Sequence, residues 1–189
     1  MKITRKTIFV VIGVVLGLAL IIFLLSRIPK REFNTFEFPD TMVAENHTTN
    51  ENADTIAMVI LNKLMGYDTM EIMVFPMPAI MEKDDKTEWI AMITQFPYQK
   101  QRYNIFIKQD AGVGKLKMAF SHEMIHLKQH ELGILETFPH DNTIYVWKGD
   151  TIKASDVKYE DRPHEKEAFR EGPQLNRELN KILYKKRQR

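Results

Sequence analysis

The hydrophobic positions of this 189-residue chain form one long apolar run, followed by shorter periodic segments. Ile8 to Leu25 is an unbroken apolar stretch of 18 residues, which is long enough to cross the hydrocarbon core of a bilayer. The remainder, about 160 residues, suits one compact domain. The pattern therefore predicts an N-terminal tail and transmembrane anchor over residues 1–31, a polar, irregular linker over 32–51 and a folded domain over 52–189.

A secretory signal peptide is the competing interpretation of the apolar run. Its apolar region would be shorter and would be followed by small residues at a cleavage site, whereas Arg27, Lys30 and Arg31 follow here. We therefore expect a single-pass membrane protein. Basic residues are balanced on the two sides of the run, and the short charged tail before it favours a cytoplasmic N-terminus and an extracytoplasmic domain.

Three segments of the domain have apolar residues at the 3.6-residue spacing of a helix. These segments are 55–64, 114–132 and 163–183. Gly66 and Gly133 lie just past the first two and are expected to end them. Pro163 suits the first position of the third helix, and Gly172-Pro173 is expected to break or kink it.

Short apolar runs between turn residues predict strands. These runs are 70–75, 88–96, 102–108, 143–147 and 151–153. The second and third are joined by a turn that begins at Pro97, so they predict a hairpin immediately before the helix over 114–132. Tyr103, Ile105 and Ile107 share one face of the third run. Together with the helices, these strands predict an α+β domain.

Composition excludes several kinds of chemistry. The chain has no cysteine, so thiol catalysis, disulfide bonds and cysteine-bound zinc are excluded. It has 27 basic and 25 acidic residues, for a net charge of +2, which gives no overall field for nucleic acid. We expect no nucleic-acid partner, and any zinc ion must be held by histidine and carboxylate side chains.

The helix over 114–132 carries the motif His122-Glu123-Met124-Ile125-His126. Positions i and i+4 share a helix face, so both imidazoles can converge on one cation while Glu123 reaches a water molecule. A catalytic zinc ion lowers the pKa of its water to about 7, and a neighbouring carboxylate can take the proton as the oxygen attacks a carbonyl. The alternative is a packed helix without metal, in which the buried imidazoles need other partners.

A catalytic zinc ion needs a third protein ligand. His130 shares the helix face of the motif but lies one turn further on, about 6 Å along the axis, so we expect it at the surface or behind the ligands. Glu165 and Glu167, at the start of the last helix, are the candidates. Glu165 shares its face with Ala168 and Phe169, which favours it. The alternative for either residue is a carboxylate in the first helical turn that interacts favourably with the helix dipole, and this interpretation needs no metal.

The region from Gly114 to Glu171 resembles the gluzincin-type HExxH metallopeptidases, in particular small versions in which a second helix supplies a glutamate. The run from Glu165 to Phe169 is similar to the E-x-x-A-N motif of ImmA/IrrE-type peptidases, with Phe169 in place of the asparagine. The resemblance implies a zincin-like fold in which a small antiparallel sheet packs on the active-site helix. It also implies a zinc-dependent endopeptidase.

The resemblance implies a role for individual residues. His122, His126 and Glu165 would hold one zinc ion, and Glu123 would act as the general base. Tyr159 and Arg162 precede the ligand helix and are candidates for stabilising an oxyanion or supporting the ligands. Such families present an edge strand to the substrate, and the run over 102–108 is the candidate here.

We therefore expect a membrane-anchored zinc metallopeptidase that hydrolyses peptide bonds in protein or peptide substrates. The alternative is a membrane-anchored, non-catalytic module that binds zinc or another protein. Bound zinc together with peptidase activity distinguishes the first from the second.

Overall fold

The computed structural model describes residues 38–78, 90–95, 99, 101–138 and 141–187. The chain divides into two units, residues 1–35 and 36–189, and every described residue belongs to the second. The predicted membrane segment from Ile8 to Leu25 lies outside the described residues. Within the described ranges, no helix combines the length and the apolar character that a membrane span requires.

Helices and strands both contribute to the described part of the chain, which confirms the predicted α+β class. In chain order they are β1 (Met42–Asn46), α2 (Ala53–Met58), the π-helix η1 (Val59–Leu64), β2 (Met70–Pro76), β3 (Ala91–Gln95), β4 (Arg102–Ile107), α3 (Val113–Glu131), β5 (Leu135–Phe138), β6 (Asp141–Trp147), β7 (Asp150–Lys153), the 3-10 turns η2 (Ala154–Asp156) and η3 (Tyr159–Asp161), and α4 (Pro163–Arg187).

The main sheet has the strand order β1-β2-β4-β3. The predicted β3–β4 hairpin is confirmed, but β1 and β4 both run parallel to β2. The sheet is therefore mixed, and the expected antiparallel sheet is wrong for these pairs. For β1 and β2 the physical reason is the crossover through α2 and η1, which returns the chain to β2 in the direction of β1. For β2 and β4 it is strand β3, which lies between them in the chain and runs in the opposite direction. A separate sheet of β5, β6 and β7 is antiparallel.

Strand β1 lies inside residues 32–51, which were expected to form an irregular linker. It pairs with β2 from Met42 opposite Met70 to Asn46 opposite Val74. Its apolar residues, Met42 to Ala44, are consecutive and do not alternate with polar ones, so the segment lacks the period-2 pattern of a strand. Only Met42 is buried, and backbone hydrogen bonds to β2 hold the segment in the sheet. The linker interpretation is therefore wrong for residues 42–46.

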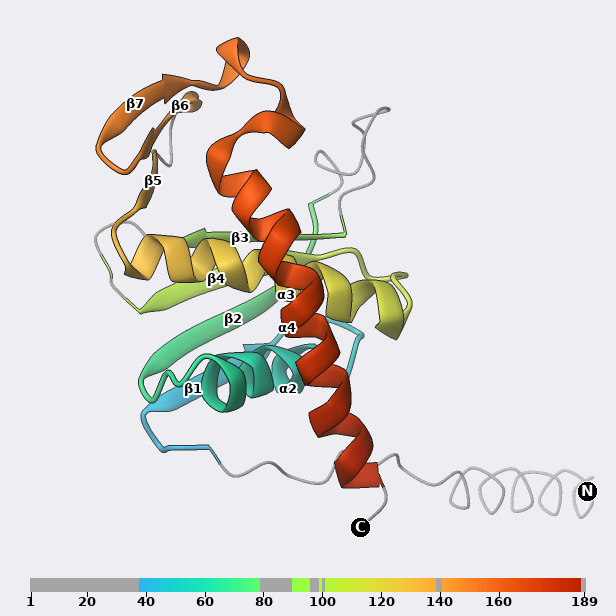
Figure 1. Ribbon diagram of the computed structural model, residues 1–189. Coiled ribbons are helices and arrows are strands. Elements are labelled where there is room, and N and C mark those ends of the chain that lie inside the picture. The colour runs from blue at the N-terminus through green and yellow to red at the C-terminus, as the bar shows by residue number, and fades with distance from the viewer. Residues whose placement is uncertain (1–37, 79–89, 96–98, 100, 139–140, 188–189) are drawn as a thin grey trace, which may run out of the picture. The chain divides into compact units, whose positions relative to one another are not determined.

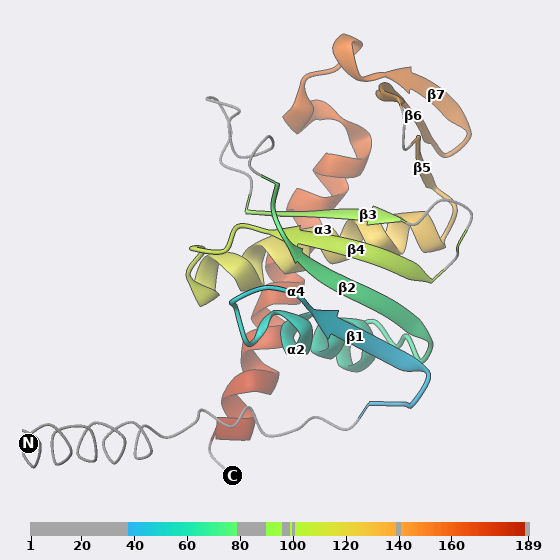
Figure 2. The ribbon, with the colours of Figure 1, turned by 180° about the vertical axis from the view of Figure 1, so that it is seen from behind.

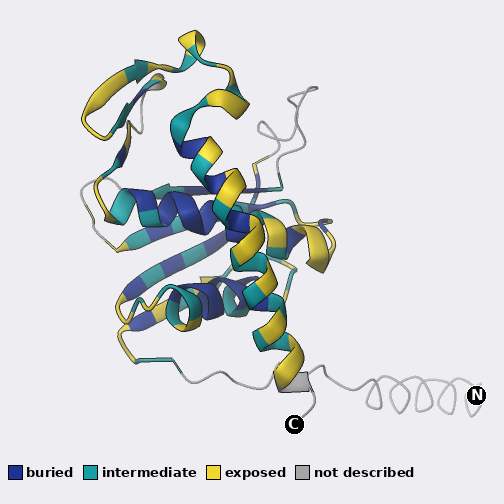
Figure 3. Ribbon diagram, viewed as in Figure 1, coloured by how far each residue is buried: buried dark blue, intermediate teal, exposed yellow. Residues whose placement is uncertain are grey.

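The helices cover one face of the main sheet, as opposite views show (Figure 1, Figure 2). Tyr103, Ile105 and Ile107 of β4 are fully buried, which confirms their predicted apolar face. The core residues of α3 are Leu116, Phe120, Met124 and Leu127. Buried residues gather between the sheet and the helices (Figure 3). This core fixes the position of α3, the helix that carries the HExxH motif.

Helix α4 continues through Gly172-Pro173, so the predicted break is absent. Gly172 is buried against α3, and a Cβ atom placed there would lie 3.3 Å from the Cα atom of His122. Proline removes one backbone hydrogen bond and its ring crowds the carbonyl one turn earlier, yet α4 remains continuous where it packs against α3. The glycine thus allows the two helices to approach closely beside the first residue of the motif.

Gly172→Val is expected to lower the free energy of unfolding by about 1–3 kcal/mol, because the added methyl groups meet the backbone of α3 rather than a flexible side chain. Gly114→Val is the matched control, since a Cβ atom on Gly114 has nothing within 4 Å. Urea unfolding followed by circular dichroism measures both. Equal losses in the two variants would contradict a tight contact at Gly172.

Candidate metal centre

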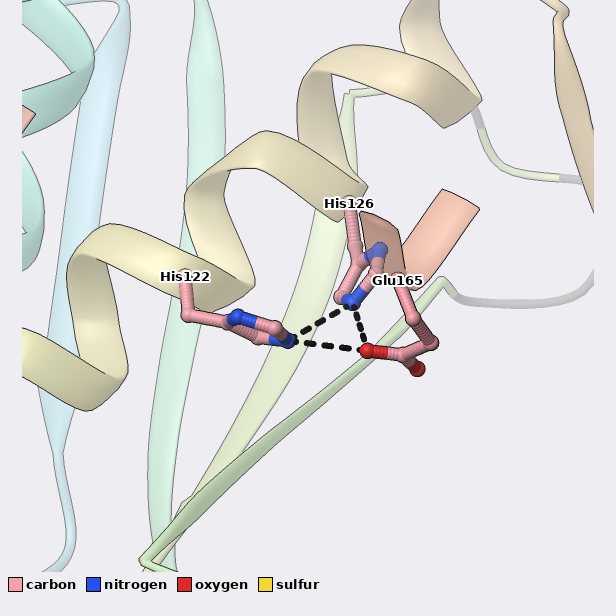
Figure 4. A group of neighbouring side chains, drawn as sticks. All are labelled: His122, His126 and Glu165. Atoms are coloured by element: carbon pink, nitrogen blue, oxygen red, sulfur yellow. Dashed lines mark hydrogen bonds and ion pairs between the residues drawn. The ribbon is translucent and has the colours of Figure 1, made fainter. Parts of the chain in front are cut away.

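Two helices bring three predicted ligands together. His122 and His126 lie one turn apart on α3, and Glu165 comes from the first turn of α4. Figure 4 shows the three side chains pointing toward a common centre. The structure therefore places the residues of the predicted triad side by side.

The ligand atoms form a compact triangle. His122 Nε2 lies 3.1 Å from His126 Nε2 and 3.1 Å from Glu165 Oε2, and the third side, from His126 Nε2 to Glu165 Oε2, is 3.4 Å. Atoms that bind one tetrahedral zinc ion at 2.0–2.1 Å lie about 3.3 Å apart. The donor set and its spacing therefore fit a metal ion, and these three residues could hold one.

The three side chains are nearly enclosed, with exposed fractions of 17% for His122, 10% for His126 and 7% for Glu165. Burial lowers the pKa of His126, but the hydrogen bond to Glu165 and the charges of Glu123 and Glu165 outweigh it and raise the pKa to about 9. Burial raises the pKa of Glu165, yet its hydrogen bonds with the two histidines hold that pKa well below its usual range. The site therefore favours positive charge between the three ligands.

Glu123 lies beside the triangle and is held from the opposite side by strand β3. Its exposed fraction is 8%, and its Oε2 atom accepts a hydrogen bond of 3.0 Å from the backbone N–H of Ile93. Burial raises the pKa of Glu123, and the charges of His126 and His122 oppose that rise. A carboxylate with a raised pKa is suited to accept and return a proton near neutral pH.

A cavity of about 460 Å³ opens on His122 and Glu123. Its remaining walls are largely apolar, and they include Met118 and Phe169, which are 59% and 51% exposed. Phe169, which replaces the asparagine of the related motif, packs against His122 with ring centroids 4.8 Å apart. The cavity can therefore receive an apolar side chain next to the triangle.

Strand β3, rather than residues 102–108, forms the sheet edge near the site. The expectation for 102–108 is wrong because β4 lies between β2 and β3. Along a strand, the backbone groups of successive residues point alternately to its two sides. Lys108 N–H donates to the Ile90 carbonyl, so the backbone groups of Ile90 face β4. Those of Ala91 and Ile93 therefore point away from β4. Among the described residues no strand pairs with this side of β3.

Tyr159 and Arg162 have different positions. Tyr159 lines the cavity and hydrogen-bonds to Glu165, and burial raises the pKa of its hydroxyl, so that hydroxyl remains a donor. Arg162 donates to the Ala154 carbonyl at 3.1 Å, and its guanidinium carbon lies 5.4 Å from the Tyr159 ring centroid. Arg162 therefore supports Tyr159 from behind.

The other two candidates lie outside the triangle. Glu167 accepts a hydrogen bond of 2.8 Å from Gln129 and is not one of the three converging ligands. His130 likewise does not join this group within the described ranges, and burial lowers its pKa to about 4. The structure thus brings Glu165, not Glu167 or His130, to the two histidines.

His164 was not identified in the sequence as a residue of the site. It is buried, and its ring centroid lies 4.5 Å from that of Tyr145 and 6.3 Å from that of Trp147, both on β6. Burial lowers the pKa of His164 to about 4, so the ring is neutral and packs as an aromatic group. The β5–β7 sheet therefore holds the start of α4, where the next residue is Glu165. No motif or spacing in the sequence marks this contact.

No family model, curated protein or solved structure matches this chain. The chemistry of the site is therefore inferred from its own residues.

Proposed function

We propose that the protein is a zinc-dependent metallopeptidase of the gluzincin type with a zincin-like fold. The observation that carries this proposal is the triangle of His122, His126 and Glu165, with the Glu123 carboxylate beside it on the wall of an open cavity. A structural zinc site is usually closed by four protein ligands, whereas a catalytic site has three and an open position. Three ligands next to a cavity support the catalytic kind.

Zinc is the ion that this donor set favours. Two imidazoles and one carboxylate form a known set of catalytic zinc ligands, while magnesium and calcium prefer sites made of oxygen ligands. We expect one zinc ion per chain. When bound, it would polarise a water molecule and lower its pKa to about 7.

In the proposed reaction, water hydrolyses a peptide bond and Glu123 transfers the proton. Glu123 takes a proton from the attacking water as the water oxygen bonds to the substrate carbonyl carbon. Glu123 then gives this proton to the leaving nitrogen as the carbon–nitrogen bond breaks. Tyr159 has a single hydroxyl donor, and when that hydroxyl turns from Glu165 toward the cavity it can donate a hydrogen bond to the oxyanion that forms. The side chains of His122, His126 and Glu165 would remain in place as ligands.

The edge of β3, with which no described strand pairs, supports an extended peptide as the substrate. The outward backbone groups of Ala91 can pair with a peptide laid along this edge, as in other cases of strand addition. The apolar cavity beside His122 can take one side chain of that peptide. We further propose that Ile8 to Leu25 anchors the protein in a membrane as a single pass, with the catalytic domain on the extracytoplasmic side.

Zinc content and cleavage, measured on the same sample, test the function. The full-length protein, purified in detergent, is expected to contain about one zinc ion per chain by elemental analysis. It is expected to cleave casein or members of a peptide library, and a chelator should stop the cleavage. His122→Ala is expected to lose both zinc and activity. His130→Ala is the matched control, because it removes a histidine from the same helix outside the triangle.

The outcomes separate the two functions. Bound zinc without cleavage of any substrate would favour a non-catalytic zinc-binding or protein-interaction module. A wild-type protein that binds no zinc would overturn the metallopeptidase proposal.

A further inference from the structure

Gln129 is a buried side chain that touches both helices of the metal centre. It lies on α3, three residues after His126, and only 1% of it is exposed. Its Oε1 atom lies 2.9 Å from His126 Nδ1. Its Nε2 atom donates to the His164 carbonyl at 3.1 Å and to Glu167 Oε2 at 2.8 Å. All three contacts are short enough to be good hydrogen bonds.

These partners fix the orientation of the Gln129 amide. An amide nitrogen has two N–H donors, and here both meet acceptors, the Glu167 carboxylate and the His164 carbonyl. The amide oxygen is thus left to face His126 Nδ1, and an oxygen can only accept. The proton of the neutral His126 ring therefore belongs on Nδ1, and the lone pair of Nε2 faces His122 and Glu165.

We propose that Gln129 is a positioning residue of the metal centre, which sets the tautomer of His126 and holds its Nε2 atom on the ligand triangle. This inference rests on the proposed function, since it assigns that site a further residue. The same amide is bonded to the carbonyl of His164, the residue before Glu165. Gln129 thereby fixes one ligand on α3 relative to another on α4.

The inference gives Glu167 a role as well. Its carboxylate accepts a hydrogen bond from the Gln129 amide, which in turn accepts one from His126. The bond to Glu167 holds the amide firmly, because hydrogen bonds to a charged group are stronger than neutral ones. Groups that hydrogen-bond to a histidine ligand orient the ring and raise its affinity for metal. Glu167 therefore contributes to the site without being a ligand.

The first test removes the amide. Gln129→Leu preserves much of the volume and is expected to lower zinc affinity by about 10–100-fold, measured by competition with a chromogenic chelator. Gln174→Leu is the control, because Gln174 is an exposed residue of α4. Unchanged zinc affinity in Gln129→Leu would overturn the inference, provided that the wild-type protein binds zinc.

The second test exchanges the hydrogen-bonding groups and guards against a simple folding defect. Gln129→Glu places two carboxylates together and leaves the His164 carbonyl without its donor, so it should weaken zinc binding. Combining it with Glu167→Gln restores the hydrogen bond between residues 129 and 167, because the new amide donates to the new carboxylate, but it does not restore the donor to the His164 carbonyl. The double variant is therefore expected to bind zinc more tightly than Gln129→Glu and more weakly than the wild type. A double variant that binds zinc no better than Gln129→Glu would overturn the role of this hydrogen-bonded chain.

A third measurement needs no metal and so separates the inference from the proposed function. In the metal-free protein, at a pH where the nitrogen-15 chemical shifts show a neutral His126 ring, those shifts also report its tautomer. The wild type is expected to carry the proton on Nδ1, and Gln129→Leu is expected to shift the population toward Nε2. An identical tautomer in both proteins would overturn the inference even if zinc binds. A wild type that binds no zinc but carries the proton on Nδ1 would overturn the proposed function and leave the tautomer assignment standing.

Discussion

Glu123→Gln is expected to reduce peptidase activity by about 10²–10⁴-fold, the range for loss of a general acid–base group, while zinc remains bound. Glutamine keeps the size of the side chain and an oxygen that can accept the Ile93 N–H bond. It cannot take a proton from water near neutral pH. The variant therefore separates proton transfer from metal binding. The rate of peptide cleavage and the zinc content of the same sample measure the two effects.

The control for this variant is Glu178→Gln, which changes a half-exposed carboxylate on α4 that is paired with Lys181. It should leave both activity and zinc content unchanged. A Glu123→Gln protein with wild-type activity would rule out Glu123 as the general base. Loss of zinc from that variant would instead mean that Glu123 contributes to the metal site itself.

The fold brings the Glu123 carboxylate close to groups that oppose and groups that favour its negative charge. Glu123 is surrounded by His122, His126 and the N–H group of Ile93, so its carboxylate has partners on both the α3 side and the β3 side. Burial in this environment opposes the charged form. A bound cation would offset the cost of burying the ionised carboxylate. The proposed metal would therefore favour the ionised form of Glu123, which is the form that accepts a proton from water.

Local signals in the sequence predict the parts of the fold that depend on periodicity. The spacing of apolar residues locates α3 within one or two residues of its observed ends, and Pro163 marks the first residue of α4. The i and i+4 relation of His122 and His126 is a property of any α-helix. The sequence alone was therefore sufficient to predict two of the three ligands and the strands β3 and β4.

Long-range packing was out of reach. The apolar residues of strand β1 do not alternate with polar ones, so this strand is defined only by its pairing with β2. Gly172 is typical of a helix breaker until its contact with His122 is known. Gln129 is an unremarkable polar residue in the sequence. Its role depends on two acceptors, at His164 and Glu167, that lie 35 and 38 residues further along the chain. No local pattern reports such partners.

The choice of the third ligand shows how far helical periodicity can be carried. Glu165 and Glu167 lie two residues apart, so they point to different sides of α4. Placing Ala168 and Phe169 on an inward face favoured Glu165, and the structure brings that carboxylate to the two histidines. Ala168 is buried, but Phe169 is 51% exposed and packs on His122 at the mouth of the cavity.

Glu165→Ala is expected to weaken zinc binding much more than Glu167→Ala. Glu165 would be a ligand of the ion, so its loss should exceed the about 10–100-fold typical of residues that only hydrogen-bond to ligands, whereas Glu167→Ala should fall within or below that range. Glu171→Ala is the control on the same helix, because its carboxylate pairs with Lys128 at 3.2 Å and lies outside the triangle. Chelator competition at one fixed pH compares the three variants. The reverse ranking would make Glu167 the ligand. The hydrogen bond between Gln129 and Glu167 would then join Gln129 to a ligand, and it would no longer explain how Gln129 positions His126.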